Sequence, residues 1–449
     1  MKRFFGPLPF YKKVAILSIP IVLQQLLSST MGIVDAIMVA RIDQVTAVGT
    51  AAQIDMFVNV VCYGASSGAG VFVAQFFGAK DPKGQRKTFG LIFSIVTGFA
   101  FLVILCCAFF GREILSFLIK DPIVIENSLI YLHVAMWSYL PAVIVGLFSF
   151  CFRSIQQNRI PTIISIFATV LHVILNYLLI FGNYGFPEMG IRGAAMGSVI
   201  AQWSALLIIL VYSILTKPSF IGGVKELFAR APALSHKILT KTFPMIYNEF
   251  FFMLGSILMI KAFGQLGTQA MDAYYVGNQV TNIFYAAIYG LSSAVIAMLG
   301  AALGAGNMVR ARQEGDYFIG MGLIISLLFA VVILLTAPWM VSLFGLSDPG
   351  VIAAAEAIIR IVSIRIGFRM FNIIIFSAIR VGGDSRFLSF LDAGVEWACG
   401  IPLAFFMVNV LGIHDIVTVF FWMNLEQAVR LLIGWKRFTS DRWIVNLAS

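Results

Sequence analysis

Runs of about twenty mostly apolar residues recur along the whole of this 449-residue sequence. Each run is long enough to cross a hydrocarbon core of roughly 30 Å as an α-helix. The composition agrees, because 60% of the residues are hydrophobic and only 12% are charged, whereas about a quarter of the residues in soluble domains carry a charge. The sequence therefore predicts an all-α integral membrane protein.

We count twelve such runs and interpret each as a transmembrane helix. Basic residues gather in alternate loops, so by the positive-inside rule both termini are expected in the cytoplasm, which requires an even number of spans. The net charge of +10 is explained by these loops and does not indicate nucleic-acid binding. The predicted spans are residues 14–39, 47–77, 89–110, 127–152, 161–181, 191–216, 239–264, 269–303, 316–344, 354–381, 387–410 and 413–434.

The two halves of the sequence repeat each other. An even number of spans per repeat keeps both copies in the same orientation, so the sequence predicts two pseudo-symmetric six-helix bundles around a central cleft. We place these bundles at residues 1–216 and 239–449, the second with a short cytoplasmic tail, and a cytoplasmic linker at 217–238. Pairs that lie 226 positions apart are Gln53 and Gln279, Tyr63 and Tyr289, Gly64 and Gly290, Gly78 and Gly304, and Arg86 and Arg312.

Asp35 lies inside the first apolar run, where an isolated charge costs roughly 2.5 to 3.5 kcal/mol. Counting 1.5 Å per helical residue from the span ends, Asn176 and Ser198 are expected at its depth, with His172 one turn further in. Asp55 of the second span is predicted at comparable depth. This set could bind Na⁺ through oxygen, with Asp35 and Asn176 as ligands, or exchange a proton. A purely structural hydrogen-bonding role remains open for each residue.

The second bundle carries more charge than a lipid-embedded bundle needs. Arg369 and Glu396 are predicted near mid-depth, where they can pair, and Glu426 lies four residues before Arg430 on one helix face. Glu249 aligns with Gln25 of the first half, while Asp35 aligns with Met259. Each bundle therefore has a carboxylate at a position where the other bundle has none. Either these charges are structural pairs, or Glu249, Arg369 and Glu396 form a second cation or substrate site.

The sequence contains no recognisable catalytic motif. There is no glycine-rich nucleotide loop with its lysine, no metal-binding histidine pair and no serine nucleophile with a plausible base. The sequence therefore predicts a protein that is not an enzyme and needs no cofactor. An ion gradient would have to supply the energy for transport.

Four stretches stand out in the sequence: GIVDAIMVARID, GFPEMGIRGAAMGSVIAQ, FPMIYNEFFFMLGS and IRVGGDSR. In this order they resemble the multidrug and toxic compound extrusion (MATE) family of bacterial type. The resemblance implies a cation-coupled antiporter, driven by H⁺ or Na⁺, that exports amphipathic small molecules by alternating access of its two bundles. It also implies a multi-pass protein of the plasma (inner) membrane, in contact with lipid and expected to be a monomer.

The family's polar positions fall on residues already singled out. Its first-helix aspartate is Asp35, its fifth-helix polar positions are His172 and Asn176, its sixth-helix threonine is Ser198, and a seventh-helix glutamate is similar to Glu249. Members with a second aspartate carry it where this chain has Asn176, and an asparagine is common at position 172. These departures favour proton exchange over a tight Na⁺ site. Arg369 also departs from the small or helix-kinking residue expected there.

Two alternative functions remain at this stage. The same architecture could flip lipid-linked or other large anionic substrates, which a strongly basic cleft would support, but most arginines and lysines are placed at the cytoplasmic ends. A non-transporting membrane receptor is the alternative of another class. It would need a soluble output domain that this sequence does not offer.

Overall fold

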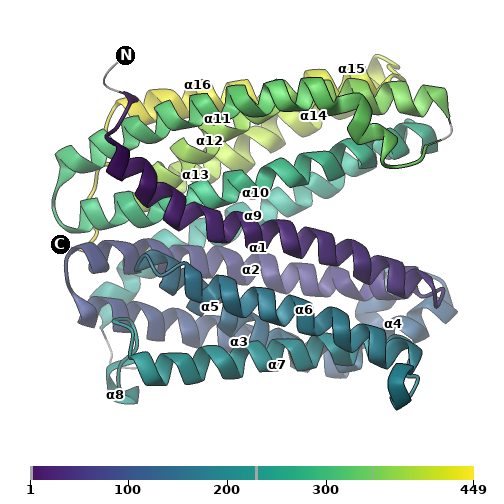
Figure 1. The fold of residues 1–449 in the computed structure, drawn as a ribbon, viewed down its shortest axis with the longest axis horizontal. Helices are drawn as coiled ribbons and strands as arrows, with labels where there is room; N and C mark the ends of the chain where they lie inside the picture. The colour runs from purple at the N-terminus through teal and green to yellow at the C-terminus, as the bar shows by residue number, and fades with distance from the viewer. Residues whose placement is uncertain (1–3, 228–230, 347, 449) are drawn as a thin grey trace. The chain divides into compact units, whose positions relative to one another are not determined.

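The computed structural model describes residues 4–227, 231–346 and 348–448, and every regular element in these ranges is a helix (Figure 1). The all-α class predicted from the sequence is confirmed. Helices dominate because a segment surrounded by lipid must satisfy its backbone N–H and C=O groups internally.

Three of the long helices begin at an Asp-Pro pair. Proline suits the first helical position, because it lacks the N–H that would be unpaired there, and the aspartate side chain caps the next free N–H groups. Asp81 accepts from Gly84 N at 3.0 Å, and Asp348 accepts from Gly350 N at 2.7 Å. The three helices are α3 (Pro82–Leu118), α4 (Pro122–Ala135) and α12 (Pro349–Val381).

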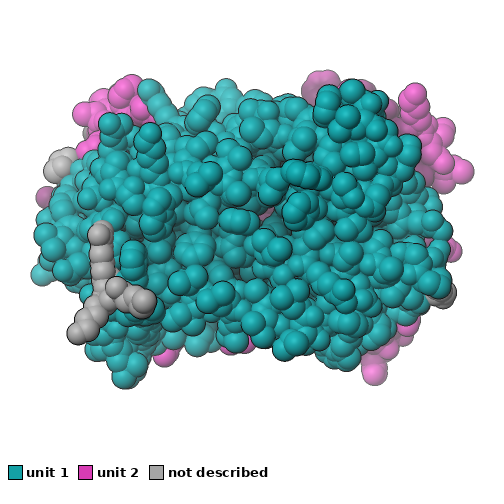
Figure 2. Space-filling model, turned by 90° about the horizontal axis from the view of Figure 1, so that it is seen from above, with its two compact units in different colours: residues 1–22, 74–80, 243–449 teal, residues 23–73, 81–242 magenta. Residues whose placement is uncertain are grey.

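The chain divides into two compact units, coloured separately in Figure 2. Unit 2 consists of residues 23–73 and 81–242. Within it α7 packs against α4, α5 and α6, and α6 and α7 run side by side (Figure 1). Besides α3 and α4, its elements are parts of α1 (Leu8–Ala40) and α2 (Val45–Gly78), then η2 (Met136–Ser138), α5 (Tyr139–Ser154), α6 (Arg159–Phe181), η3 (Asn183–Gly185), α7 (Ile191–Thr216) and α8 (Val224–Leu227).

Unit 1 consists of residues 1–22, 74–80 and 243–449, and α12 lies at its centre. This helix packs against α10, α11, α15 and α16. The segments η4, η5 and η6 are π-helical, a form often found at functional sites. The elements besides α12 are the remaining parts of α1 and α2, the part of α9 (Pro232–Gly264) from residue 243 onward, whose first turns belong to unit 2, then α10 (Thr268–Gly304), α11 (Met308–Ser342), α13 (Ser385–Ser389), η4 (Phe390–Gly394), η5 (Glu396–Gly400), α14 (Ile401–Phe405), η6 (Phe406–Val410), α15 (Ile416–Met423) and α16 (Glu426–Thr439).

Among the described residues, eleven helical stretches are long and apolar enough to cross a membrane. Two of them join several elements: Pro122–Ser154 corresponds to the predicted span 127–152, and Ser385–Val410 corresponds to 387–410. The remaining predicted span, 354–381, lies within α12, whose 33 residues are about 50 Å long as a helix. Each predicted span therefore coincides with a helical stretch, but α12 is not among the eleven that are apolar enough to cross a membrane.

The division into bundles at 1–216 and 239–449 stays a prediction, as does the cleft. Residues 1–22 and 74–80 group with the second half of the chain, so α1 and α2 each contribute to both compact units. The predicted linker, 217–238, contains α8 and the first turns of α9, and its residues 228–230 lie outside the described part.

The sequence repeat is visible where α2 and α10 cross inside unit 1. A Cβ atom on Gly78 would lie 2.0 Å from the carbonyl oxygen of Ala301, and one on Gly304 would lie 1.7 Å from that of Gln75. Gln75 and Ala301, like the two glycines, are 226 positions apart. Each repeat therefore supplies the same glycine to the same crossing, and neither position has room for a side chain.

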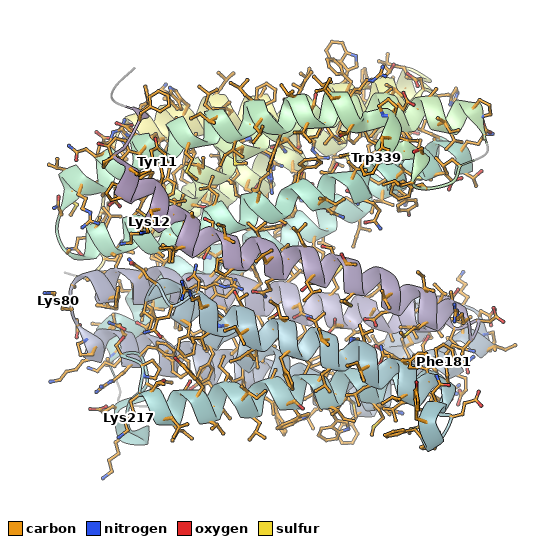
Figure 3. All side chains as sticks on the ribbon, viewed as in Figure 1. Tyr11, Lys12, Lys80, Phe181, Lys217 and Trp339 are labelled. Atoms are coloured by element: carbon orange, nitrogen blue, oxygen red, sulfur yellow. The ribbon has the colours of Figure 1, made fainter. Side chains whose placement is uncertain are left out.

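The labelled lysines lie at one end of the helices in each unit (Figure 3). In unit 1, Lys12 and Lys80 lie at one end of the helices and Trp339 at the other (Figure 3). In unit 2, Lys217 and Phe181 are separated in the same way (Figure 3). This polarity is typical of helices that span a bilayer, with lysines on the cytoplasmic side and aromatic residues near the interface.

We expect Gly78→Ala to lower the free energy of unfolding by about 2 to 3 kcal/mol, because the added methyl would meet a backbone oxygen that cannot move aside. Gly98→Ala in α3 is the control, since nothing lies within 4 Å of its Cβ position. Thermal unfolding of the two purified variants in detergent checks this. Equal melting temperatures would contradict the tight crossing.

Candidate ion-coupling site and buried ionic network

Asp35 of α1 lies against two side chains of α6 in unit 2. Its Oδ2 is 3.1 Å from Nδ1 of His172, and its Oδ1 accepts a hydrogen bond from Nδ2 of Asn176 at 3.1 Å. The Asp35 side chain is 26% exposed. The carboxylate is therefore not sealed inside the unit, although it lies within a membrane-spanning helix.

Helical periodicity brings the remaining members of this set together. His172 and Asn176 are four residues apart and share a face of α6, while Ser198 enters from the adjacent α7. The Ser198 hydroxyl lies 2.9 Å from Nε2 of His172, and Nδ2 of Asn176 lies 3.2 Å from the same nitrogen. The structure thus brings Asp35, His172, Asn176 and Ser198, predicted to share a level, into one hydrogen-bonded cluster.

The partners of His172 indicate which of its nitrogens carries hydrogen. Nε2 faces the Asn176 amide nitrogen, which can only donate, so Nε2 must accept. Nδ1 then carries the hydrogen, and it lies 3.1 Å from Oδ2 of the Asp35 carboxylate.

The Asn176 side chain is buried. Among the described residues, its Oδ1 atom has no hydrogen-bond partner. This oxygen packs directly against Gly197 of α7, where a Cβ atom would lie 2.1 Å from it. Gly197 therefore makes the space that Asn176 needs in order to reach Asp35 and His172.

Asp55 does not join the hydrogen-bonded cluster among the described contacts. Its carboxylate accepts from Asn59 of its own helix at 3.1 Å. Sequence reasoning missed Tyr131 of α4, whose phenol interacts with Ser198. Its phenol is a polar group inside the fourth predicted span, and that was the available signal.

The predicted residues of unit 1 are all close to opposite charges, but their partners differ from those expected. Glu249 pairs with Arg380 at 3.2 Å. Arg369 was expected to pair with Glu396, but it lies 3.9 Å from Asp392. Glu396 instead pairs with Arg430 at 3.5 Å. The pairing differs because α16 inserts a second arginine beside the π-helical segment that carries both carboxylates.

Arg430 is the centre of this network and is almost completely buried. Its guanidinium lies 2.9 Å from Asp392 and 3.3 Å from Glu426, in addition to its contact with Glu396. The spacing of Glu426 and Arg430 in the sequence predicted their pair. Asp392 was missed, although it lies four residues before Glu396 and so shares its helix face.

The Arg430 network and the Asp35 cluster differ in whether their polar groups are fixed by opposite charges. Arg430 and its three carboxylates fasten α16 to η4 and η5, and removing one partner of such a buried set typically costs 3 to 5 kcal/mol. The Asp35 cluster holds a single carboxylate among neutral groups, and its members can rearrange their hydrogens. The described residues form no group of three or more metal-ligating His, Cys, Asp or Glu side chains.

The chain matches the family model described as MatE over residues 20–178 and 244–406, one segment in each half. It is 26% identical over 444 residues to a probable multidrug resistance protein NorM of Thermotoga maritima, covering 96% of this chain and 93% of that protein. It is 23% identical over 432 residues to the uncharacterized transporter YisQ of Bacillus subtilis, covering 95% and 93% respectively.

A crystal structure of a mutant of the Vibrio cholerae MATE transporter VcmN shares the fold, with a TM-score of 0.88. The two chains are 18% identical, and the match covers 96% of this chain and 97% of that one. The resemblance noted in four short stretches thus extends over both halves of the molecule. The protein is therefore a multi-pass membrane protein, and it belongs to the MatE family of transporters.

Proposed function

We propose that this protein is a secondary antiporter that exports amphipathic small molecules in exchange for protons, with Asp35 as the coupling carboxylate. The observation that carries the proposal is the cluster in which Asp35 accepts a hydrogen bond from Asn176 and lies 3.1 Å from Nδ1 of His172. Relatives named as multidrug resistance proteins support a small-molecule cargo.

Proton uptake would change the geometry of this cluster. An O–H on Asp35 would face the amide nitrogen of Asn176, and two donors cannot pair. Turning the Asn176 amide would present Oδ1 instead, and this is the atom that has no partner when Asp35 is ionised. Protonation of Asp35 is thereby linked to the packing of α6 against α7, where Oδ1 touches Gly197.

Such a linkage is what antiport requires. If the protonated and ionised clusters favour different packing of unit 2, substrate and proton can each stabilise a different conformation. Binding of one then weakens binding of the other by the same factor in both directions. His172 and Ser198 would complete the path by which hydrogens rearrange around the carboxylate.

The donor set favours H⁺ over Na⁺ as the coupling ion. A hard cation is held by several oxygen ligands, but each oxygen of Asp35 already faces a nitrogen of His172 or Asn176. Na⁺ would have to displace both nitrogens, and the cluster has no second carboxylate. A proton needs only one free lone pair.

The remaining features of the proposal concern location and partners. We place the protein in the plasma (inner) membrane with both termini in the cytoplasm, as the charge of its loops indicates. It would act as a monomer, surrounded by lipid, with small molecules as its cargo, no cofactor and no nucleic-acid partner.

Asp35→Asn should reduce proton-driven export at least tenfold, because the amide keeps the shape of the carboxylate but cannot exchange a proton. Uptake of a fluorescent zwitterionic dye into everted vesicles measures export, and separate pH and Na⁺ gradients can be imposed on these vesicles. Asp55→Asn is the matched control, since Asp55 bonds to its own helix. Wild-type rates in Asp35→Asn would disprove the assignment, and transport driven by Na⁺ alone would disprove the choice of ion.

Gly197→Ala should impair export about as severely as Asn176→Ala, because the new methyl would occupy the position of Asn176 Oδ1. The double variant should be no worse than either single variant, as expected for two changes acting on one interaction. Gly49→Ala, with nothing within 4 Å of its Cβ position, is the control. Additive losses in the same vesicle assay would show that Gly197 acts independently of Asn176.

A further inference from the structure

Two arginines one helical turn apart on α12 converge on a single tyrosine inside unit 1. The guanidinium carbons of Arg365 and Arg369 each lie 6.0 Å from the centre of the Tyr285 ring. Arg365 also lies 5.7 Å from the Phe420 ring, and Arg369 lies 5.7 Å from the Phe252 ring. Aromatic faces offset part of the cost of burying a cation.

The two arginines differ in how their charge is balanced. Arg369 has a carboxylate oxygen of Asp392 at 3.9 Å. Arg365 has no Asp or Glu oxygen within 4.0 Å among the described residues, and its Nε atom is buried without a hydrogen-bond partner. The other arginines of α12 all have carboxylate partners: Arg360 pairs with Glu356 at 3.3 Å, and Arg380 pairs with Glu249 at 3.2 Å.

Arg365 is also the arginine of α12 that lies furthest from both ends of the helix. It lies at the middle of α12 (Pro349–Val381), about 24 Å from either end at 1.5 Å per residue. A charged side chain at that depth is costly, and it usually marks a substrate or ion pathway. The distance also separates it from the phosphate groups of lipids, which lie at the membrane surfaces.

We propose that Arg365 is an anion-binding subsite that receives the carboxylate or sulfonate group of an amphipathic aromatic substrate. The proposal rests on the antiporter function above and narrows its substrate class to molecules that carry an acidic group, whether anionic or zwitterionic. A guanidinium binds a carboxylate through two parallel hydrogen bonds. The Tyr285 and Phe420 rings beside it would contact the planar apolar part of the same molecule.

The test uses a matched pair of probes, 1-pyrenebutyric acid and its uncharged primary amide. Equilibrium dialysis against the purified full-length protein in phosphatidylcholine nanodiscs measures the affinity for each. Arg365→Gln should weaken binding of the acid at least tenfold and binding of the amide less than twofold. Arg365→Lys should produce an intermediate loss for the acid alone, because an ammonium keeps the charge but not the paired donors.

Arg360→Gln is the matched control, because it removes a half-exposed arginine of the same helix that already has a carboxylate partner. Its affinity for both probes should equal that of the wild type. If Arg365→Gln fails to fold, Arg365→Lys carries the test. Nanodiscs containing one fifth phosphatidylglycerol test whether an anionic lipid occupies the subsite, which would abolish binding of the acid.

The proposal is overturned if the wild type binds neither probe, if both probes lose affinity equally in the variants, or if anionic lipid displaces the acid. Equilibrium binding requires no gradient, so these outcomes are independent of ion coupling. Loss of Arg365-dependent binding with proton-driven export intact would disprove the subsite alone. Intact subsite binding without proton-driven export would disprove the antiporter assignment instead.

Discussion

Everything in this molecule depends on the absence of water from the hydrocarbon core of a membrane. Without water, backbone groups must pair within each segment, which makes every spanning element a helix. For the same reason, each charged side chain must find a partner inside the protein or remain at high cost. The long apolar helices and the compact ionic clusters both follow from this constraint. The clusters supply the polar groups on which any ion binding or exchange depends.

The two units meet this constraint in different ways. In unit 2, a single carboxylate is held by an amide and an imidazole, so no permanent opposite charge fixes its protonation state. In unit 1, Arg430 contacts three carboxylates. These contacts connect α16 with η4 and η5. The first arrangement suits exchange of a proton, whereas the second suits rigidity. Arg365 belongs to neither pattern, because it has charge without a carboxylate partner.

Much of this arrangement could be predicted from the sequence, because helical geometry converts residue spacing into depth. The levels of Asp35, Asn176 and Ser198 follow from counting residues from the span ends, and the structure places them within hydrogen-bonding reach of His172 or of one another. The pair of Glu426 and Arg430 follows from spacing within one helix. What spacing cannot give is the rotation of one helix against another, which is why Arg369 was assigned to Glu396 rather than to Asp392. The π-helical turns that carry Asp392 and Glu396 also change the face on which a residue emerges.

The crossing of α2 and α10 has a consequence for how the halves can diverge. Gly78 meets Ala301 just as Gly304 meets Gln75, so the contact is self-complementary in the manner of an isologous dimer interface. In a homodimer both subunits have the same sequence, so a carboxylate introduced in one subunit is also introduced in the other. Because the two repeats belong to one chain, each can be substituted separately. A single polypeptide can keep the symmetric glycine contact and still carry an aspartate at position 35 where the other repeat carries a methionine at 259, so that only one half needs to accommodate a charge there.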